Sequence, residues 1–253
     1  MVRTCVMAAK KIRLDERLVA DGLAESRAKA QALVMSGVVA VDGAVIDKPG
    51  TRVAPEAAVE LRTSGSRFVS RGGDKLAGAL EDLGVDPAGR TCLDLGASTG
   101  GFTDCLLQAG ARRVYAVDVG YGQLDARLRG DARVVVLERI NARALEPAQI
   151  PEPIGLVVAD LAFISLRLVV PALAAVAPAA EWLLLVKPQF EVGRERVGKG
   201  GVVRDDALRA AAVDSVRDAC AALGWAQVAR ADSRVHGPKG NREVFLLLRR
   251  PLR

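Results

Sequence analysis

An apolar stretch that runs into a glycine-rich turn constrains the fold of this chain more than any other feature of its 253 residues. Residues 91–95 have the composition of a β-strand, and Gly96-Ala97-Ser98-Thr99-Gly100-Gly101 follows directly. We expect a helix next, ending at Gly110. Its apolar face would consist of Phe102, Cys105, Leu106 and Ala109. Because glycine has no Cβ, the turn lets backbone groups approach a ligand closely. The segment therefore predicts a nucleotide-binding unit.

The spacing of the glycines favours S-adenosylmethionine over a dinucleotide. The dinucleotide fingerprint needs a second glycine beside a pyrophosphate, and Ser98 stands at that position. S-adenosylmethionine has no phosphate, so we expect carbonyls and amides around Gly96 to hold its methionine end. The next predicted strand ends in Asp118, about 24 residues after Asp94, near the offset of a ribose-binding carboxylate. The expected cofactor residues are Asp94, Gly96, Ala97, Ser98, Gly100 and Asp118.

Composition narrows the classes of function. A net charge of +6 favours an anionic partner, and nucleic acid more than an acidic metabolite. A single histidine, His236, disfavours Ser/His/Asp hydrolysis and most His-rich metal sites. The longest uncharged run, residues 168–180, is too short to cross a bilayer and contains two prolines. Without a Cys-x-x-Cys pair, the cysteines are expected as buried free thiols of a soluble, cytoplasmic protein.

The first 62 residues are predicted to form a small recognition domain, with a leader over residues 1–12 and a linker over 63–66. We expect helices over 14–21 and from Ser26 to Gly37, then strands over 38–41, 44–46 and 58–61. The candidate RNA-binding residues are Lys10, Lys11, Arg13, Arg17, Arg27 and Lys29. An ordinary solvated helix face fits the charges equally well, because acidic residues are interleaved with them. These are Asp15, Glu16, Asp21 and Glu25.

Residues 67–253 alternate between predicted strands and helices, which favours an α/β fold with a mostly parallel sheet covered on both faces. The expected strands are 91–95, 114–118, 134–137, 155–160, 182–187, 227–231 and 243–248. The longest expected helix is 205–223, with an apolar stripe of Leu208, Ala212, Val216 and Cys220.

Charged residues end several of these strands. Asp160 and Lys187 each follow an apolar strand, and Asp94 lies at the end of the first. Ligands of such sheets bind beyond the carboxyl ends of the strands, where neighbouring Asp160 and Lys187 could form an orienting pair. For each residue alone, a strand that reaches solvent is an equally good interpretation.

Four segments together resemble the TlyA family of ribosomal RNA 2′-O-methyltransferases, sometimes labelled hemolysins. They are Ser70-Arg71-Gly72-Gly73-Asp74-Lys75-Leu76, residues 94–104, Val186-Lys187-Pro188-Gln189-Phe190-Glu191 and Gly237-Pro238-Lys239-Gly240-Asn241-Arg242-Glu243. The resemblance runs from about Met7 to the end, and leaves open whether translation starts at Met1 or Met7. It implies a Rossmann-like class I methyltransferase domain with a seven-stranded, mostly parallel sheet, after an α+β domain similar to the RNA-binding domain of ribosomal protein S-four.

The resemblance also implies a catalytic Lys-Asp-Lys-Glu tetrad, here Lys75, Asp160, Lys187 and Glu243. Lys187 would take the proton of a cytidine 2′-hydroxyl. Burial and the nearby charge of Lys75 would keep the amine of Lys187 near neutrality. Asp160 would orient Lys187 and help hold the ribose, and Glu243 would fix the lysines. S-adenosylmethionine is the implied cofactor, without a metal, and ribosomal RNA within ribosomal subunits is the implied partner.

Other residues have weaker assignments. Asn141 would lie near the adenine of the cofactor, although a turn role fits it as well. Lys199 and Lys239 lie in predicted loops and could touch phosphates, but loop lysines are usually only solvated. Three rival functions are a membrane-active hemolysin, a small-molecule methyltransferase and an inactive RNA-binding protein. Neither a membrane partner nor an oligomer is indicated by the sequence.

Overall fold

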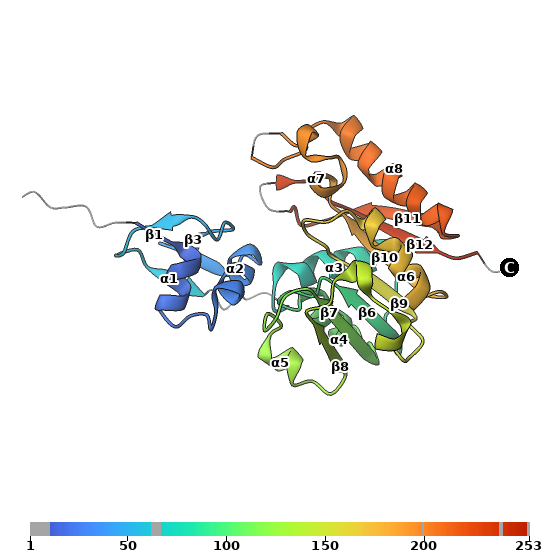
Figure 1. Cartoon of the computed structure of the whole chain (residues 1–253), viewed down its shortest axis with the longest axis horizontal. Helices are drawn as coiled ribbons and strands as arrows, with labels where there is room; N and C mark the ends of the chain where they lie inside the picture. The colour runs from blue at the N-terminus through green and yellow to red at the C-terminus, as the bar shows by residue number, and fades with distance from the viewer. Residues whose placement is uncertain (1–10, 62–66, 199, 238–239, 252–253) are drawn as a thin grey trace, which may run out of the picture. The chain divides into compact units, whose positions relative to one another are not determined.

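The chain divides into two compact units, Met1–Gly65 and Ser66–Arg253. The computed structural model describes residues 11–61, 67–198, 200–237 and 240–251 (Figure 1). The expected linker, residues 63–66, and the leader up to residue 10 lie outside these ranges, and Cys5 with them. The domain boundaries expected from the sequence remain a prediction.

The N-terminal unit combines two helices with short strands. Its elements are β1 (Ile12–Arg13), α1 (Leu14–Ala20), α2 (Arg27–Met35), β2 (Val39–Val41), β3 (Ala44–Val45), β4 (Arg52–Val53) and β5 (Val59–Leu61). Strands β3, β2 and β5 form one sheet, and β1 pairs with β4. Ser26 caps α2, since its hydroxyl accepts a hydrogen bond from the backbone N–H of Lys29. Apolar residues of both helices and of β2 form the core, including Leu14, Leu18, Ala30, Val34 and Val39.

The C-terminal unit contains one seven-stranded sheet in the order β11-β12-β10-β9-β6-β7-β8. The strands are β6 (Thr91–Leu95), β7 (Arg113–Asp118), β8 (Val134–Glu138), β9 (Leu156–Ala159), β10 (Glu181–Val186), β11 (Ala226–Asp232) and β12 (Val244–Arg249). Strands β8, β7, β6, β9 and β10 are parallel, whereas β12 runs antiparallel to both β10 and β11. The predicted mostly parallel seven-stranded sheet is confirmed.

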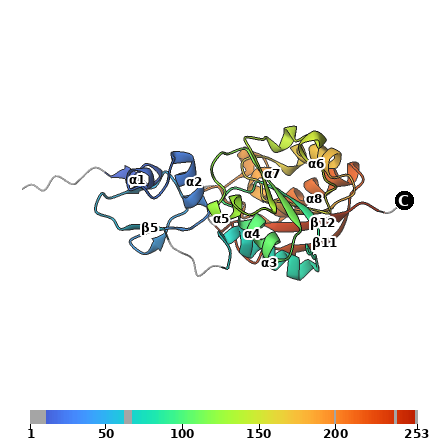
Figure 2. The ribbon, with the colours of Figure 1, turned by 90° about the horizontal axis from the view of Figure 1, so that it is seen from below.

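Helices cover both faces of this sheet (Figures 1 and 2). They are α3 (Arg71–Leu83), α4 (Gly101–Gln108), α5 (Ala126–Arg129), α6 (Val170–Val176), α7 (Pro188–Glu191) and α8 (Asp206–Ala222), with 3-10 turns at Ala142–Ala144, Pro147–Gln149, Leu166–Leu168 and Arg194–Arg196. One core packs α6 and α8 against the sheet, and the other packs α3, α4 and α5 on the opposite face. The carboxyl ends of the strands therefore remain available for a site.

The sequence predicted the strands of the sheet within one residue at each end. It missed the helices α3, α5, α6 and α7 and the two-residue strands β1 and β4. In α8, Ala212, Val216 and Cys220 are buried as expected, whereas Leu208 is only half-buried. The cysteines in the described ranges, Cys92, Cys105 and Cys220, are buried free thiols.

Candidate active site

Helix α3 brings Lys75 to the edge of the sheet, because glycines allow it to pack closely on the start of α4. A Cβ on Gly101 would lie 2.2 Å from Ser70 Oγ and 2.8 Å from the backbone nitrogen of Gly73. A Cβ on Gly73 would lie 2.3 Å from the side chain of Phe68. These distances are too short for real atoms, so packing requires glycine at positions 73 and 101.

The register of the sheet brings the other three tetrad residues together. Asp160 directly follows β9 and Lys187 directly follows β10, and these two strands are parallel neighbours. Glu243 directly precedes β12, whose residue Val244 pairs with Val186 of β10. Glu243 and Lys187 therefore lie at the same end of neighbouring antiparallel strands.

The tetrad consists of two ion pairs. Lys75 Nζ donates to Glu243 Oε2 at 2.6 Å, and both side chains are buried. Lys187 Nζ pairs with Asp160 Oδ1, and its side chain is 12% exposed. Glu243 also attracts Lys187, and Lys75 also attracts Asp160. All four predicted residues thus lie together as an electrically neutral cluster.

The charge state of Lys187 differs from the sequence-based expectation. Burial acts to lower the pKa of Lys187, but the charges of Asp160 and Glu243, with a hydrogen bond to Asp160, outweigh it and raise the pKa above its usual range. For Asp160, burial acts to raise the pKa, but Lys187 and Lys75 outweigh it and lower the pKa. Lys187 is therefore a protonated ammonium at rest. The expectation of near neutrality was wrong because two carboxylates, Asp160 and Glu243, attract the charge of Lys187.

The glycine-rich turn is held mainly by its own hydrogen bonds. The backbone N–H groups of Gly96 and Ala97 both donate to the carbonyl of Val117, at 2.9 and 3.1 Å. The N–H of Ser98, which has a φ of 48°, donates to Asp118 Oδ2 at 2.8 Å. We expected these amides to be free to bind a ligand, but they are not, because they already donate to acceptors on the neighbouring strand β7.

Asp94 and Asp118 flank this turn in different environments. Asp94 is fully buried, and Thr103 of α4 donates to its Oδ2 at 2.6 Å. Its Oδ1 has no hydrogen-bond partner among the described residues. Burial is the largest cause that raises the pKa of Asp94 to about 7, and the nearby charges of Asp160 and Asp118 add to it. Asp118 is half-buried and also accepts from the N–H of Gly120 at 2.6 Å.

Two other predicted cofactor residues have structural roles here. Gly100 has a φ of 99°, and a Cβ there would lie 2.3 Å from Leu128 Cδ1. Turn geometry and packing therefore explain this glycine without a ligand. Asn141 is exposed, and its side chain accepts a hydrogen bond from the N–H of Arg143 at 3.0 Å, which begins a 3-10 turn. This contact matches the turn role kept as the alternative.

An aromatic pair beside the tetrad was missed by the sequence reasoning. Phe163 is 80% exposed and has a φ of 66°, which is an unusual conformation for a bulky residue. Its ring lies 5.3 Å from that of Phe190, tilted by 53°. Phe163 follows Asp160 by three residues, and Phe190 follows Lys187 by three. The sequence could have indicated this pair, because each phenylalanine lies three residues beyond a charged residue that ends a predicted strand.

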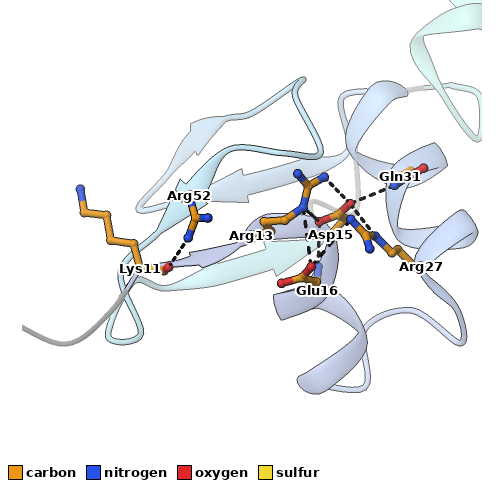
Figure 3. Close-up of polar contacts among 7 residues, drawn as sticks. All are labelled: Lys11, Arg13, Asp15, Glu16, Arg27, Gln31 and Arg52. Carbon is orange, nitrogen blue, oxygen red and sulfur yellow. Dashed lines mark hydrogen bonds and ion pairs between the residues drawn. The ribbon is translucent and has the colours of Figure 1, made fainter.

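The N-terminal unit contains a second cluster of mixed charge, which we call the arginine cluster: Arg13, Asp15, Glu16 and Arg27. Asp15 is fully buried and accepts from Arg13 at 2.8 and 2.9 Å, from Arg27 at 3.1 Å and from Gln31 at 2.9 Å (Figure 3). The hydrogen bond from Arg13 is the largest cause that holds the pKa of Asp15 far below its usual range. Asp15 is therefore a buried anchor for two arginines and not part of a solvated face.

The remaining basic candidates differ in their surroundings. Arg17 donates to Asp21 at 2.6 Å and to the carbonyl of Pro55 at 2.6 Å, so it joins α1 to the loop after β4. The Lys11 side chain is exposed and extends away from the arginine cluster (Figure 3). Lys29 is half-buried in α2. Lys10, Lys199 and Lys239 lie outside the described residues, as the grey segments of Figure 1 indicate.

Comparisons with known proteins agree with this architecture. The profile of FtsJ-like methyltransferases matches residues 68–250, and that of S4 domains matches residues 12–59. The 16S/23S rRNA (cytidine-2′-O)-methyltransferase TlyA of Mycobacterium tuberculosis is 52% identical over 243 residues, which cover 95% of this chain and 91% of the relative. The chain belongs to the TlyA family. The predicted family and its methyltransferase domain are confirmed.

Hemolysin names occur within the same TlyA family. Hemolysin A of Brachyspira hyodysenteriae is 39% identical, covering 92% of this chain and 98% of the relative. A solved structure of a candidate hemolysin from Streptococcus thermophilus is 38% identical with a TM-score of 0.73, covering 96% of this chain and 90% of that one. Within the described residues, no helix combines the length and hydrophobicity needed to cross a membrane.

Proposed function

We propose that this TlyA-family chain transfers a methyl group from S-adenosylmethionine to the ribose 2′-hydroxyl of a cytidine in ribosomal RNA. It would act on ribosomal subunits in the cytoplasm, with residues 1–62 as the RNA-binding domain and 67–253 as the methyltransferase domain. The observation that carries the proposal is the tetrad of two lysines and two carboxylates at the strand ends. Neither a membrane partner nor a metal ion is part of the proposal.

The tetrad suits transfer to a weakly acidic hydroxyl. Lys187 Nζ, in its neutral amine form, would accept the proton of the 2′-hydroxyl as the oxygen gains the methyl group. Asp160 would hold Lys187 in place through their ion pair and contact the ribose. Glu243 would keep the charge of Lys75 beside the reacting oxygen, where it steadies developing negative charge. Because the pKa of Lys187 is raised, the reactive amine is a minor form at neutral pH.

Two buried acceptors, one at the glycine-rich turn and one in the tetrad, fit a cationic cofactor. Asp94 Oδ1 and Glu243 Oε1 are buried carboxylate oxygens without hydrogen-bond partners among the residues described. S-adenosylmethionine carries an ammonium group and a sulfonium group, and a buried carboxylate is stabilised by such a charge. When bound, it supplies an electrophilic methyl group. Asp94, Gly96, Ala97 and Ser98 would surround its methionine end, and Asp118 its ribose, while Gly100 and Asn141 would shape the surrounding turns.

Two surfaces would contact RNA. The exposed ring of Phe163 offers a stacking surface for an unstacked base next to the tetrad. In the N-terminal unit, Arg13 and Arg27 would contact phosphates, and the exposed side chain of Lys11 would add a separate contact. A nucleotide inside a helix could not place its 2′-oxygen at the strand ends, so we expect it to flip out.

The test uses purified ribosomal subunits, the full chain and S-adenosylmethionine labelled in its methyl group. We expect mass mapping to find the label on the 2′-oxygen of a cytidine, and a Lys187→Ala variant to bind the cofactor but transfer no methyl group. Label on free metabolites without RNA would favour a small-molecule methyltransferase. Cofactor-free lysis of lipid vesicles would favour the hemolysin alternative.

A further inference from the structure

Glu191 is a buried carboxylate that lies four residues beyond Lys187. It ends the motif of residues 186–191, and the proposed mechanism gives it no role. Its side chain is only 2% exposed. Oε1 accepts a hydrogen bond from the backbone N–H of Leu166 at 2.8 Å, and Oε2 accepts one from Ser165 Oγ. Arg167 lies 3.5 Å from Oε2 and donates to the carbonyl of Glu191 at 3.3 Å. All of these partners belong to the segment that follows Asp160.

Two segments from neighbouring strands are thereby joined at three successive points. The first point is the ion pair between Asp160 and Lys187, directly after β9 and β10. The second is the contact of Phe163 with Phe190. The third is Glu191 with Ser165, Leu166 and Arg167. Glu191 makes the last of these contacts. Residues 160–167 and 187–191 are therefore joined at both ends.

A device that holds this segment is needed because part of it is strained. Phe163 combines a positive φ with an exposed ring, and such a conformation persists only where the surroundings fix it. The backbone N–H of Leu166 is buried, so removing its acceptor would leave an unpaired donor and favour a different loop conformation.

We propose that Glu191 is a positioning residue, which holds the segment of Asp160 and Phe163 against the segment of Lys187 and Phe190. This inference rests on the proposed function, in which those segments carry the base and the surface for the nucleotide. Glu191 acts through hydrogen bonds accepted by two oxygens and does not itself touch the reacting atoms.

The test compares Glu191→Ala with Glu191→Gln in the full chain. Glutamine keeps an acceptor for the buried Leu166 N–H and loses only the acceptor of Ser165 Oγ, because that oxygen already accepts from the backbone N–H and from Nε of Arg167 and cannot accept from an amide as well. We expect Glu191→Ala to lower kcat for methyl transfer to ribosomal subunits about 100-fold, with the KM for subunits and cofactor affinity unchanged. Glu191→Gln should recover kcat to within about tenfold of the wild-type value, because the buried Leu166 N–H keeps its acceptor.

Two further variants separate positioning from general stability. Ser165→Ala removes one partner only, so it should lower kcat about tenfold and add nothing in a Glu191→Ala background. Glu152→Ala removes another hydrogen-bonded carboxylate, which is 24% exposed and accepts from Tyr115 at 3.1 Å and from Arg112 at 3.2 Å, away from the tetrad. This matched control should lower thermal stability and leave kcat unchanged.

A direct measurement of the aromatic pair is independent of catalysis. Magnetisation transfer between the Phe163 and Phe190 rings in NMR should persist in Glu191→Gln and disappear in Glu191→Ala. The inference is wrong if the ring contact persists in Glu191→Ala, or if Glu191→Gln is as slow as Glu191→Ala. A wild-type chain that transfers no methyl group would instead refute the proposed function, and the ring contact would still decide the role of Glu191.

Discussion

The two units of this protein each contain a cluster of two cations and two carboxylates, and the clusters differ in cation and burial. The tetrad uses lysines whose side chains are 9% and 12% exposed. The arginine cluster uses Arg13 and Arg27, whose side chains are 35% and 55% exposed, around the buried Asp15. Both clusters carry no net charge, so charge balance alone does not distinguish a reactive site from a binding surface.

The difference lies in what each cation can release. A lysine can lose a proton when its surroundings allow, whereas the guanidinium of arginine stays charged in proteins and offers several donors in a fixed plane. Buried lysines therefore suit proton transfer, and half-exposed arginines suit phosphate contacts. In the arginine cluster, the buried Asp15 fixes both arginines and leaves their outer surfaces in solvent.

The largest expected effect comes from exchanging the cation of the tetrad. Lys187→Arg keeps the positive charge opposite Asp160 but cannot accept the 2′-hydroxyl proton, so the rate of methyl transfer should fall about 1000-fold. Single-turnover transfer to ribosomal subunits measures the rate, and the dissociation constant of the cofactor should stay unchanged. A Lys187→Arg variant with a near-normal rate would break the distinction between the clusters.

A pH profile of the wild-type chain sharpens the same point. Asp160 and Glu243 outweigh burial and raise the pKa of Lys187, so the reactive amine increases as pH rises. Below that pKa, the single-turnover rate should increase nearly tenfold per pH unit, from about pH 7 to pH 9. A flat profile in this range would show that Lys187 does not act as the base.

The sequence was sufficient for most of the sheet and for the longest helices, because continuous apolar runs indicate the buried parallel strands and a period near 3.6 indicates amphipathic helices. It missed α3, since the motif before Lys75 contains two glycines that disfavour helix in isolation. Those glycines are tolerated because α3 packs closely against Gly101. The two-residue strands β1 and β4 were also missed, because so short a pattern carries no period.

Local sequence identified the charged residues of both clusters but not their electrostatic state. Whether Lys187 is neutral depends on which carboxylate faces each lysine, and Glu243 precedes a strand that is distant in the sequence but adjacent in the sheet. The sequence pattern indicated that Asp15 is one of several surface acids, although it is the buried centre of its cluster. The amides near Gly96 could not be assigned either, because their acceptor, Val117, lies on the next strand.

Two buried aspartates extend the comparison to stability, with opposite dependence on pH. The pKa of Asp94 is raised to about 7, above its unfolded value of about 4. The contribution of the protonated Asp94 carboxyl to the free energy of unfolding is therefore complete below about pH 4. It is lost as the pH rises to about 7. The pKa of Asp15 is lowered, so its contribution is present above about pH 4 and is lost on acidification.

Replacing either aspartate with asparagine should show in which direction its contribution to stability changes with pH. Asp94→Asn keeps an acceptor for Thr103 and removes the buried charge, so it should stabilise the C-terminal unit by about 2 to 4 kcal/mol at pH 8 and by less at pH 5. Urea unfolding followed by tryptophan fluorescence reports on this unit, because Trp182 and Trp225 both lie in its core. Asp15→Asn should destabilise the N-terminal unit at pH 7, as measured by amide hydrogen exchange. An equal effect of Asp94→Asn at both pH values would contradict a raised pKa.

The smallest expected effect concerns the arginine cluster, where exchanging the cation should be tolerated. If Arg27 contacts a phosphate mainly through its positive charge, Arg27→Lys keeps that charge and should weaken binding to ribosomal subunits no more than about threefold. Arg27→Gln should weaken it about tenfold and reduce the slope of log affinity against log salt by about 0.7 to 0.9, the value of one phosphate contact. Titrations of the full chain at several salt concentrations measure both quantities. Equal losses for lysine and glutamine, with an unchanged slope, would mean that Arg27 only balances Asp15 and Glu16.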